Sequence, residues 1–379
     1  MKIAFAYESA YPWFNGGIEK RRYNILKALS KSKKYELHMF TLYRPGMPGR
    51  EFEYEGVKYH CVGVGTEISG MYKGSRRSML MSIKFALLLF LHIWKYKFDI
   101  IDTDSFPFLH IPLLYIYAKL RRTYLVATWH EVWSKEFWKG YLHRLGSVGF
   151  FFEYLSAKLP SMHIANTSTT KKLLRQYFSV EPKKVLVLPA AVDQEEVERF
   201  LAKHACKQEN KFVVANRLVF HKRTDIAVKS IKGVDAKLVI IGKGPELSNL
   251  KELAKQLGVD KQVVFKHDLT EQQLYEELCT SLALIMVSER EGLSLITAEA
   301  LSLGVPVAVS SNTSLPPEIL KYCLRSKTED VHDLLLKIRK NAAAYKQNYL
   351  KQRKEVLAEF SGTASEAVYN AISRAREAK

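Results

Sequence analysis

The sequence predicts an α/β protein made of two Rossmann-like, doubly wound domains that face each other across a cleft. The chain has 379 residues, which is too long for one ordinary core and suits two domains of roughly 150–200 residues each. Hydrophobic residues make up 47% and charged residues 26%, a balance that is typical of globular proteins and excludes a disordered chain. Short apolar runs alternate with helical patterns from end to end. Several of these runs are continuous in Val, Ile and Leu, as expected for parallel strands covered on both faces.

Each half of the chain contains its own series of strands. In the first half we expect strands at Ile3–Tyr7, Glu36–Tyr43, Ile100–Thr103, Tyr124–Thr128, His163–Asn166 and Val185–Leu188. In the second half we expect them at Phe212–Ala215, Lys237–Ile241, Val263–Lys266, Leu282–Met286 and Val305–Ser310. Helical patterns lie between the strands, for example at Gly17–Leu29, Asp225–Ile231, Pro245–Leu257 and Glu271–Leu278. This repeated βα order predicts parallel sheets, which bind ligands beside the carboxyl ends of their strands.

Composition also predicts the domain boundaries. A polar stretch separates the two series of strands, so we expect a first domain over residues 1–195, a linker over 196–210 and a second domain over 211–360. The last segment, residues 361–379, has the pattern of an isolated amphipathic helix. We expect this helix to pack back on the first domain.

The formal charge of +19 is unevenly distributed along the chain. Residues 1–175 hold 27 Lys and Arg against 13 Asp and Glu, whereas residues 176–379 hold 31 against 26. The basic first domain can serve nucleic acid, an anionic membrane surface or an acidic substrate, and it can equally be a solvated basic surface.

One apolar run, Ser78 to Trp94, has about the minimum length for a membrane span. Lys84 interrupts it and no second span follows, so we favour a helix packed on a sheet over membrane insertion. The N-terminus goes directly into a strand pattern, without the features of a signal peptide.

The four cysteines lie far apart and form no Cys-x-x-Cys pair; they are Cys61, Cys206, Cys279 and Cys323. This spacing argues against a structural zinc site or a disulfide framework. It favours a reducing, cytoplasmic environment.

Two acidic residues lie at the start of a predicted helix in the second domain. Ser294 is expected to cap the helix Leu295–Leu303, which places Glu291 in the preceding loop and Glu299 about one turn inside. The free N–H groups of a helix start bind phosphate, and each carboxylate can accept hydrogen bonds from paired sugar hydroxyls. The alternative is that both glutamates only complement the helix dipole, for about 0.3–1 kcal/mol each. That alternative does not explain Gly292, which lets the backbone approach a ligand closely.

Two cations lie just past a predicted buried strand. Arg217 follows Phe212–Ala215, and Lys222 precedes a helix that Asp225 helps to start. At the carboxyl end of a strand, two cations would neutralise a leaving diphosphate without any metal ion. The alternative is a solvated basic loop.

These motifs together resemble glycosyltransferase family 4, the retaining enzymes of the GT-B fold. That family carries an Arg–x4–Lys pair opening its second domain and a Glu–x7–Glu motif later in it. Arg217 with Lys222, and Glu291 with Glu299, match both spacings in the expected order. The resemblance covers nearly the whole chain and implies a nucleoside-diphosphate sugar, UDP- or GDP-linked, as donor.

The resemblance also implies a role for each matched residue. Arg217 and Lys222 would hold the donor diphosphate and stabilise it as it leaves. Glu291 would contact the sugar hydroxyls at the reacting end, and Glu299 would hold the ribose.

The N–H groups of Gly292, Leu293 and Ser294 would face sugar and phosphate. Leu293 and Ser294 depart from the commoner Glu-Gly-Phe-Gly form of the family, which leaves the donor sugar open.

Further matches are weaker. Gly16 and Gly17 follow the first strand and match the Gly-Gly loop of the family, where a phosphate can approach a helix N-terminus. His130 matches a histidine beside the transferred sugar, and Leu269 lies in a loop that approaches the nucleobase in the family. The alternatives are an ordinary turn at the glycines and a histidine that only satisfies its neighbours.

The sequence therefore predicts a metal-independent, retaining hexosyltransferase in which the leaving phosphate accepts the acceptor proton. Its expected catalytic residues are Glu291, His130, Arg217 and Lys222. The expected acceptor is a lipid-linked sugar or a cell-surface glycan, with peripheral contact of the basic first domain with the cytoplasmic face of an anionic membrane; a soluble acceptor is the alternative. Its aromatic and basic segments, Arg76–Trp94 and Tyr141–Lys158, suit such contact.

Two rival functions belong to other classes of protein. One is a GT-B protein that binds nucleotide and has lost activity, which would bind without transfer or donor hydrolysis. The other is a nucleic-acid-binding protein, which would explain the charge but leave the Glu291–Glu299 arrangement without a purpose.

Overall fold

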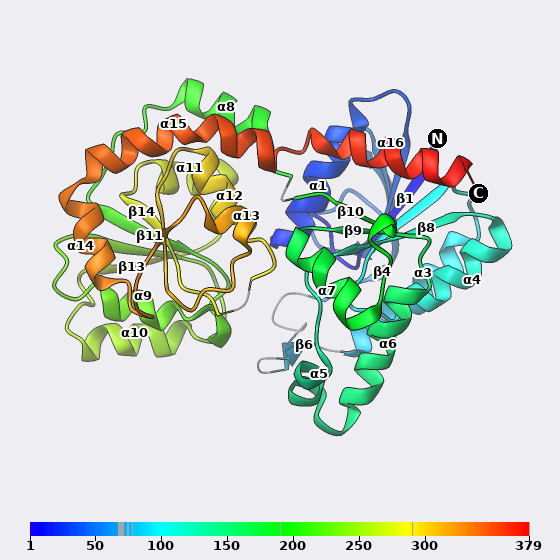
Figure 1. The fold of residues 1–379 in the computed structure, drawn as a ribbon, viewed down its shortest axis with the longest axis horizontal. Helices are drawn as coiled ribbons and strands as arrows, with labels where there is room; N and C mark the ends of the chain where they lie inside the picture. Colours follow the sequence, from blue (N-terminus) through cyan, green and yellow to red (C-terminus); the bar gives the residue numbers. More distant parts are fainter. Residues whose placement is uncertain (67–71, 74–75, 78, 190, 290, 379) are drawn as a thin grey trace. The chain divides into compact units, whose positions relative to one another are not determined.

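The structure is a computed structural model that describes residues 1–66, 72–73, 76–77, 79–189, 191–289 and 291–378 (Figure 1). The chain forms two compact units. The N-terminal unit comprises Met1–Ala191 and Gly362–Lys379, and the C-terminal unit comprises Val192–Ser361. Each unit is built around a largely parallel sheet, which confirms the predicted α/β class.

The N-terminal unit contains an eight-stranded sheet in the order β10-β9-β8-β7-β1-β2-β4-β3, in which only β3 is antiparallel. Its strands are β1 (Lys2–Ala6), β2 (Glu36–Tyr43), β3 (Glu51–Tyr54), β4 (Val57–Val64), β7 (Ile100–Asp104), β8 (Tyr124–Trp129), β9 (Met162–Ala165) and β10 (Val185–Val187). Its helices are α1 (Gly17–Ser30), α3 (Met79–Ile93), α4 (His110–Arg121), α5 (Lys135–Leu142), α6 (Gly146–Lys158), α7 (Ser168–Phe178) and α16 (Ala364–Glu377). A separate ribbon pairs β5 (Tyr72–Lys73) with β6 (Arg76–Arg77).

Alternate residues of each central strand in this unit enter different cores. In β1, Ala4 and Ala6 contact the core beneath α3, α4, α6 and α7, whereas Ile3 and Phe5 contact the core beneath α1 and α16. Burial of both faces explains why the strands read as continuous apolar runs. The final helix α16 lies along α1, and the ring of its Tyr369 is 5.6 Å from that of Phe5 (Figure 1).

The apolar run near residue 80 forms α3, which buries Phe85, Leu89 and Ile93 in the core. The prediction of a helix packed on a sheet is therefore confirmed, with Ser78 lying outside the described residues. Among the helices that the structure describes, none combines the length and apolarity that a bilayer crossing needs.

The C-terminal unit contains a parallel sheet in the order β13-β12-β11-β14-β15-β16. Its strands are β11 (Lys211–Ala215), β12 (Lys237–Ile241), β13 (Val263–Lys266), β14 (Ala283–Met286), β15 (Val307–Val309) and β16 (Leu324–Arg325). Its helices are α8 (Gln194–Lys203), α9 (Thr224–Ser230), α10 (Leu247–Gln256), α11 (Glu271–Cys279), α12 (Leu295–Ser302), α13 (Pro317–Leu320), α14 (His332–Lys340) and α15 (Ala342–Phe360). Helices α9 and α10 cover one face of the sheet, and α11 and α12 the other (Figure 1).

The segment predicted as a linker, residues 196–210, is different in the structure. Residues 194–203 form α8, which begins at Asp193 with a side-chain hydrogen bond from the backbone N–H of Glu196 and belongs to the C-terminal unit. The segment is polar in overall composition, but its apolar residues Val197 and Phe200 lie about one turn apart and are both buried. This is the pattern of an amphipathic helix.

The sequence argument against disulfides is wrong for one pair, because a disulfide joins Cys206 to Cys279. These cysteines are 73 residues apart in sequence. They meet because the chain after α8 runs beside the end of α11, where the backbone N–H of Glu209 donates to the carbonyl of Thr280 at 2.7 Å. Cys61 and Cys323 are free.

Candidate active site

The strand order of the C-terminal unit reverses between β11 and β14, its two central neighbours. In open α/β sheets, ligands bind outside the carboxyl ends of the strands at such a switch point. The loop after β11 carries Arg217 and Lys222, and the chain after β14 carries Glu291. Sheet order therefore brings together two motifs that are about 70 residues apart in sequence.

Lys222 and Glu291 are in direct contact. The Nζ atom of Lys222 donates to Oε1 of Glu291 at 2.6 Å, and their side chains are only 14% and 10% exposed. The Glu291 backbone N–H donates to Oγ of Ser314 at 2.7 Å, which holds this carboxylate in place. Arg217 lies exposed on the same loop as Lys222.

The helix α12 starts after Ser294, as predicted, but Ser294 does not cap it through its side chain. Its backbone has φ 64°, and its Oγ lies 2.8 Å from Oγ1 of Thr297. The side chain of Leu293 is buried. Within the described part of the chain, no backbone carbonyl accepts from the N–H groups of Gly292, Leu293 or Ser294.

Glu299 lies inside α12 and is only 2% exposed. Helix α12 packs against α11, where burial first and then the negative charge of Glu299 raise the pKa of the Tyr275 phenol well above its ordinary value. The two glutamates are thus in different environments, Glu291 paired at the switch point and Glu299 buried within the helix layer.

The loop after β12 owes its glycines to close packing. A Cβ on Gly242 would lie 1.9 Å from the carbonyl oxygen of Asn216, and one on Gly244 would lie 2.1 Å from that of Leu218. These glycines therefore allow the loops after β11 and β12 to pack together. Leu269 is half-buried in the neighbouring loop, between β13 and α11.

In the N-terminal unit the strand order reverses between β1 and β7, and the predicted glycines lie at the start of α1 after β1. A Cβ on Gly16 would lie 2.2 Å from Oε2 of Glu19, so Gly16 makes room for that buried carboxylate. A Cβ on Gly17 would meet open space. Only Gly17 therefore leaves room for a ligand at this helix start.

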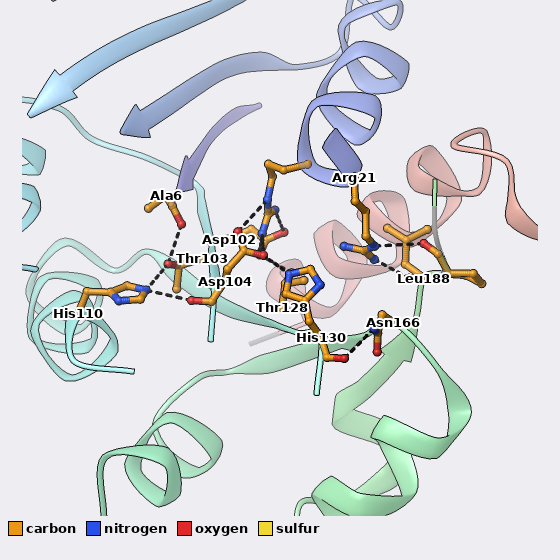
Figure 2. A network of polar contacts seen from close by, with 12 residues as sticks. Ala6, Arg21, Asp102, Thr103, Asp104, His110, Thr128, His130, Asn166 and Leu188 are labelled. Carbon is orange, nitrogen blue, oxygen red and sulfur yellow. Dashed lines mark hydrogen bonds and ion pairs between the residues drawn. The ribbon is translucent and has the colours of Figure 1, made fainter. Parts of the chain in front are cut away.

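His130 follows β8 and is held by a buried carboxylate. Its Nε2 lies 2.6 Å from Oδ1 of Asp104, at the end of β7, and its backbone carbonyl accepts from Nδ2 of Asn166 at 2.7 Å (Figure 2). Because Asp104 accepts, Nε2 carries the proton, which leaves Nδ1 as the acceptor nitrogen of the neutral ring.

A network of buried charges supports Asp104. Arg22 of α1 lies 2.8 Å from both Asp104 and Asp102, and all three side chains are almost fully buried. Asp102 also accepts from Oγ1 of Thr128 at 2.7 Å and from the hydroxyl of Tyr369 on α16. Figure 2 shows Asp102, Asp104 and His130 grouped together, with Asp104 at the end of β7 and His130 just after β8.

Electrostatics keep Asp104 and Arg22 charged beside a neutral imidazole. Burial raises the pKa of Asp104, but Arg22 and the His130 hydrogen bond outweigh it and hold that pKa below its ordinary value. Burial lowers the pKa of His130, which Asp104 only partly offsets, so the ring is neutral at pH 7. Arg22 keeps its charge because Asp102 and Asp104 outweigh the burial that would lower its pKa.

Two family models match the chain. The model for glycosyl transferases group 1 matches residues 196–340, and the model for Glycosyltransferase Family 4 matches residues 15–196. Together the two matches cover residues 15–340, and the chain belongs to the glycosyltransferases described by these two models, group 1 and family 4. Both predicted motif pairs lie within the group 1 match, and the predicted Gly16, Gly17 and His130 lie within the family 4 match.

Curated relatives match only part of the chain. The N-acetyl-alpha-D-glucosaminyl L-malate synthase of Bacillus anthracis is 27% identical over 152 residues, which cover 38% of this chain and 39% of that protein. The GDP-mannose-dependent alpha-(1-6)-phosphatidylinositol monomannoside mannosyltransferase of Mycolicibacterium smegmatis is 28% identical over 120 residues, which cover 28% and 31%. The matched stretches thus span well under half of either relative.

Solved glycosyltransferase structures match the whole fold. The sucrose-phosphate synthase of Thermosynechococcus elongatus has a TM-score of 0.78 at 15% identity, covering 98% of both chains. Anabaena HepE in complex with UDP-glucose has a TM-score of 0.72 at 14% identity, covering 99% of this chain and all of that one. This glycosyltransferase therefore has the GT-B fold.

Asp102, Asp104, Arg22 and Tyr369 were not among the residues expected at the site. A usable signal was present, because two aspartates in a strand that begins with Ile100 and Ile101 need partners if the strand is buried. The Arg21-Arg22 pair in the first helix offered the cations. Nothing in the sequence indicated that Tyr369, in the last helix, would reach them.

Proposed function

We propose that this protein is a retaining glycosyltransferase that moves a sugar from a UDP- or GDP-linked donor to an acceptor hydroxyl. The observation that carries the proposal is the contact of Lys222 with Glu291 at the switch point of the C-terminal sheet. This contact joins a phosphate-binding cation to a hydroxyl-binding carboxylate at the edge where α/β sheets bind ligands. The Anabaena structure that contains UDP-glucose supports a donor of this class.

The proposed reaction proceeds on one face of the sugar. The bond from the anomeric carbon to the donor phosphate breaks while the acceptor oxygen bonds to that carbon from the same side. The leaving phosphate takes the acceptor proton, and Arg217 with Lys222 stabilises its charge, so no metal ion is needed.

The remaining residues hold the donor and the acceptor hydroxyl. Glu291 binds sugar hydroxyls, Glu299 holds the ribose, and the N–H groups near Gly292 bind sugar or phosphate. His130 presents Nδ1 to a hydroxyl because Asp104 engages Nε2. Because Glu299 is buried, its position supports a role in holding the donor and argues against a role as a nucleophile flanking the reacting bond.

We further propose a lipid-linked or cell-surface glycan as acceptor, with peripheral contact to an anionic membrane through α3 and α4. Leu80, Leu91 and Leu120 are 74%, 65% and 68% exposed, and the lysines Lys84 and Lys119 are exposed between them. Neither helix contains an acidic residue. An exposed apolar stripe with interspersed cations suits an anionic bilayer, and the Mycolicibacterium relative is named for a lipid acceptor.

Calorimetric titration with a panel of UDP- and GDP-sugars tests the central proposal, because it identifies the nucleotide and the sugar together. Arg217→Ala and Lys222→Ala should each reduce transfer at least about 100-fold with folding intact, since each removes a cation from the leaving diphosphate. Lys229→Ala is the matched control, because Lys229 is an exposed lysine of α9 that pairs only with Asp225 among the contacts described. Transfer at the wild-type rate by either site variant would exclude the assignment, and nucleotide binding without transfer or hydrolysis would indicate an inactive GT-B protein.

A further inference from the structure

The ammonium of Lys222 already has a protein partner. Its 2.6 Å contact with Glu291 joins two mostly buried side chains from the loop after β11 and the loop after β14. The backbone N–H of Glu289 donates to the carbonyl of His221 at 3.1 Å, which ties the two loops together beside the pair. The ion pair therefore lies mostly buried between two loops that are hydrogen-bonded to each other, unlike an ion pair on the exposed surface.

We propose that the Lys222–Glu291 ion pair makes diphosphate binding conditional on the sugar, so that the site discriminates against free nucleoside diphosphate. This inference rests on the proposed function, in which Lys222 binds the diphosphate. A diphosphate that recruits Lys222 removes the cation from Glu291. It also places new negative charge beside a carboxylate that is only 10% exposed. Leaving a poorly solvated charge without its partner is strongly unfavourable.

The sugar of the donor supplies the missing compensation. Sugar hydroxyls donate hydrogen bonds to the Glu291 carboxylate and replace those it loses from Lys222. A complete donor thus gives both Lys222 and Glu291 a new partner, whereas a nucleoside diphosphate gives a new partner only to Lys222. Discrimination then comes from an unfavourable contact with the wrong ligand as well as a favourable contact with the right one. After transfer, re-formation of the pair favours release of the nucleoside diphosphate.

A second ion pair in the same loops provides the control. Glu289 pairs with Arg223, and this pair is more exposed, at 24% and 44% for its two side chains. Glu289→Gln removes the same charge as Glu291→Gln from the same loop but leaves Lys222 and Glu291 together. Any general effect of removing negative charge near a diphosphate should therefore appear in both variants.

The experiment measures the Kd of UDP, UDP-glucose, GDP and GDP-mannose by calorimetry for the wild type and both variants at one ionic strength. Glu291→Gln should bind the matching nucleoside diphosphate about tenfold more tightly and should bind the nucleotide sugar no more tightly. Glu289→Gln should change both affinities equally, by less than about threefold. In a Lys222→Met background, Glu291→Gln should strengthen nucleoside diphosphate binding by a clearly smaller factor, since the ion pair is already broken and only the repulsion between carboxylate and diphosphate is left to relieve; an equal gain in both backgrounds would overturn the inference.

Each outcome has a defined meaning. Unchanged or weaker nucleoside diphosphate binding by Glu291→Gln, or an equal gain in Glu289→Gln, overturns the inference while the proposed function stands. A wild-type protein that binds none of the nucleotide sugars overturns the proposed function and this inference with it. If Glu291→Gln does not fold, Glu291→Asp serves instead, because a shorter carboxylate that weakens the pair should also strengthen nucleoside diphosphate binding, and no gain overturns the inference.

Discussion

Tyr369→Phe should destabilise the N-terminal unit by about 2 kcal/mol. The Tyr369 hydroxyl on α16 donates to the fully buried carboxylate of Asp102, which also accepts from Arg22 and Thr128. A hydrogen bond to a charged group contributes about 1.5–3 kcal/mol. The other two donors keep Asp102 partnered, so the loss should lie within that range and below the larger cost of breaking a buried ion pair.

Urea unfolding followed by tryptophan fluorescence measures this effect selectively. All five tryptophans lie in the N-terminal unit, so their emission reports on that unit alone. With an m-value of about 2–3 kcal/mol per M, the expected loss lowers the midpoint of the tryptophan transition by roughly 0.7–1 M. Tyr35→Phe is the matched control, because Tyr35 donates to the neutral Asn370 of α16 in a partly buried hydrogen bond.

The control should shift the midpoint by about half as much, since a neutral hydrogen bond contributes only about 1 kcal/mol. An equal shift in the two variants would refute the argument that a buried charge at Asp102 depends on the last helix. A Tyr369→Phe variant with the wild-type midpoint would refute it as well.

Three further predictions follow from other parts of the chain. Burial raises the pKa of Glu153 to about 8 against the backbone N–H of Trp133 and the indole of Trp138. An acid whose pKa is higher in the folded state binds more protons folded than unfolded. The free energy of unfolding of the wild type should therefore fall, relative to that of Glu153→Gln, by roughly 3–5 kcal/mol as pH rises from about 4.5 to 8. A constant difference in urea midpoint between the two proteins across that range would contradict this. The double variant Leu80→Gln with Leu91→Gln should sediment several-fold less with phosphatidylglycerol vesicles, because it removes apolar contact with the bilayer. Leu336 is an exposed leucine of α14, and Leu336→Gln should sediment like the wild type. Equal vesicle binding by the wild type, the double variant and Leu336→Gln would exclude the α3–α4 surface. Sugar transfer should keep its rate in EDTA, because cations of the protein stabilise the leaving phosphate, and loss of transfer restored by Mg²⁺ or Mn²⁺ would show that a metal is required.

Local pattern was enough to predict most of the regular structure. Three strands have the boundaries that were predicted, namely Glu36–Tyr43, Lys237–Ile241 and Val263–Lys266, and the start of α12 follows Ser294 as expected. Such elements are predictable because continuous apolar runs and helix starts depend on neighbouring residues. The hairpin of β3 and β4 was missed, although Glu55-Gly56 between the strands is a short turn in which both residues have positive φ.

The sequence by itself determined the family, the two-unit α/β architecture and the residues of both motif pairs, because these depend on local spacing and composition. Tertiary structure alone decided which of these residues meet. Strand order places β11 beside β14 and so brings Lys222 to Glu291, and the return of α16 brings Tyr369 to Asp102. The physical reason is that sheet order and helix packing set the partner of a buried charge, across 69 residues for Lys222 and Glu291 and 267 for Tyr369 and Asp102, and no local pattern records such a distance.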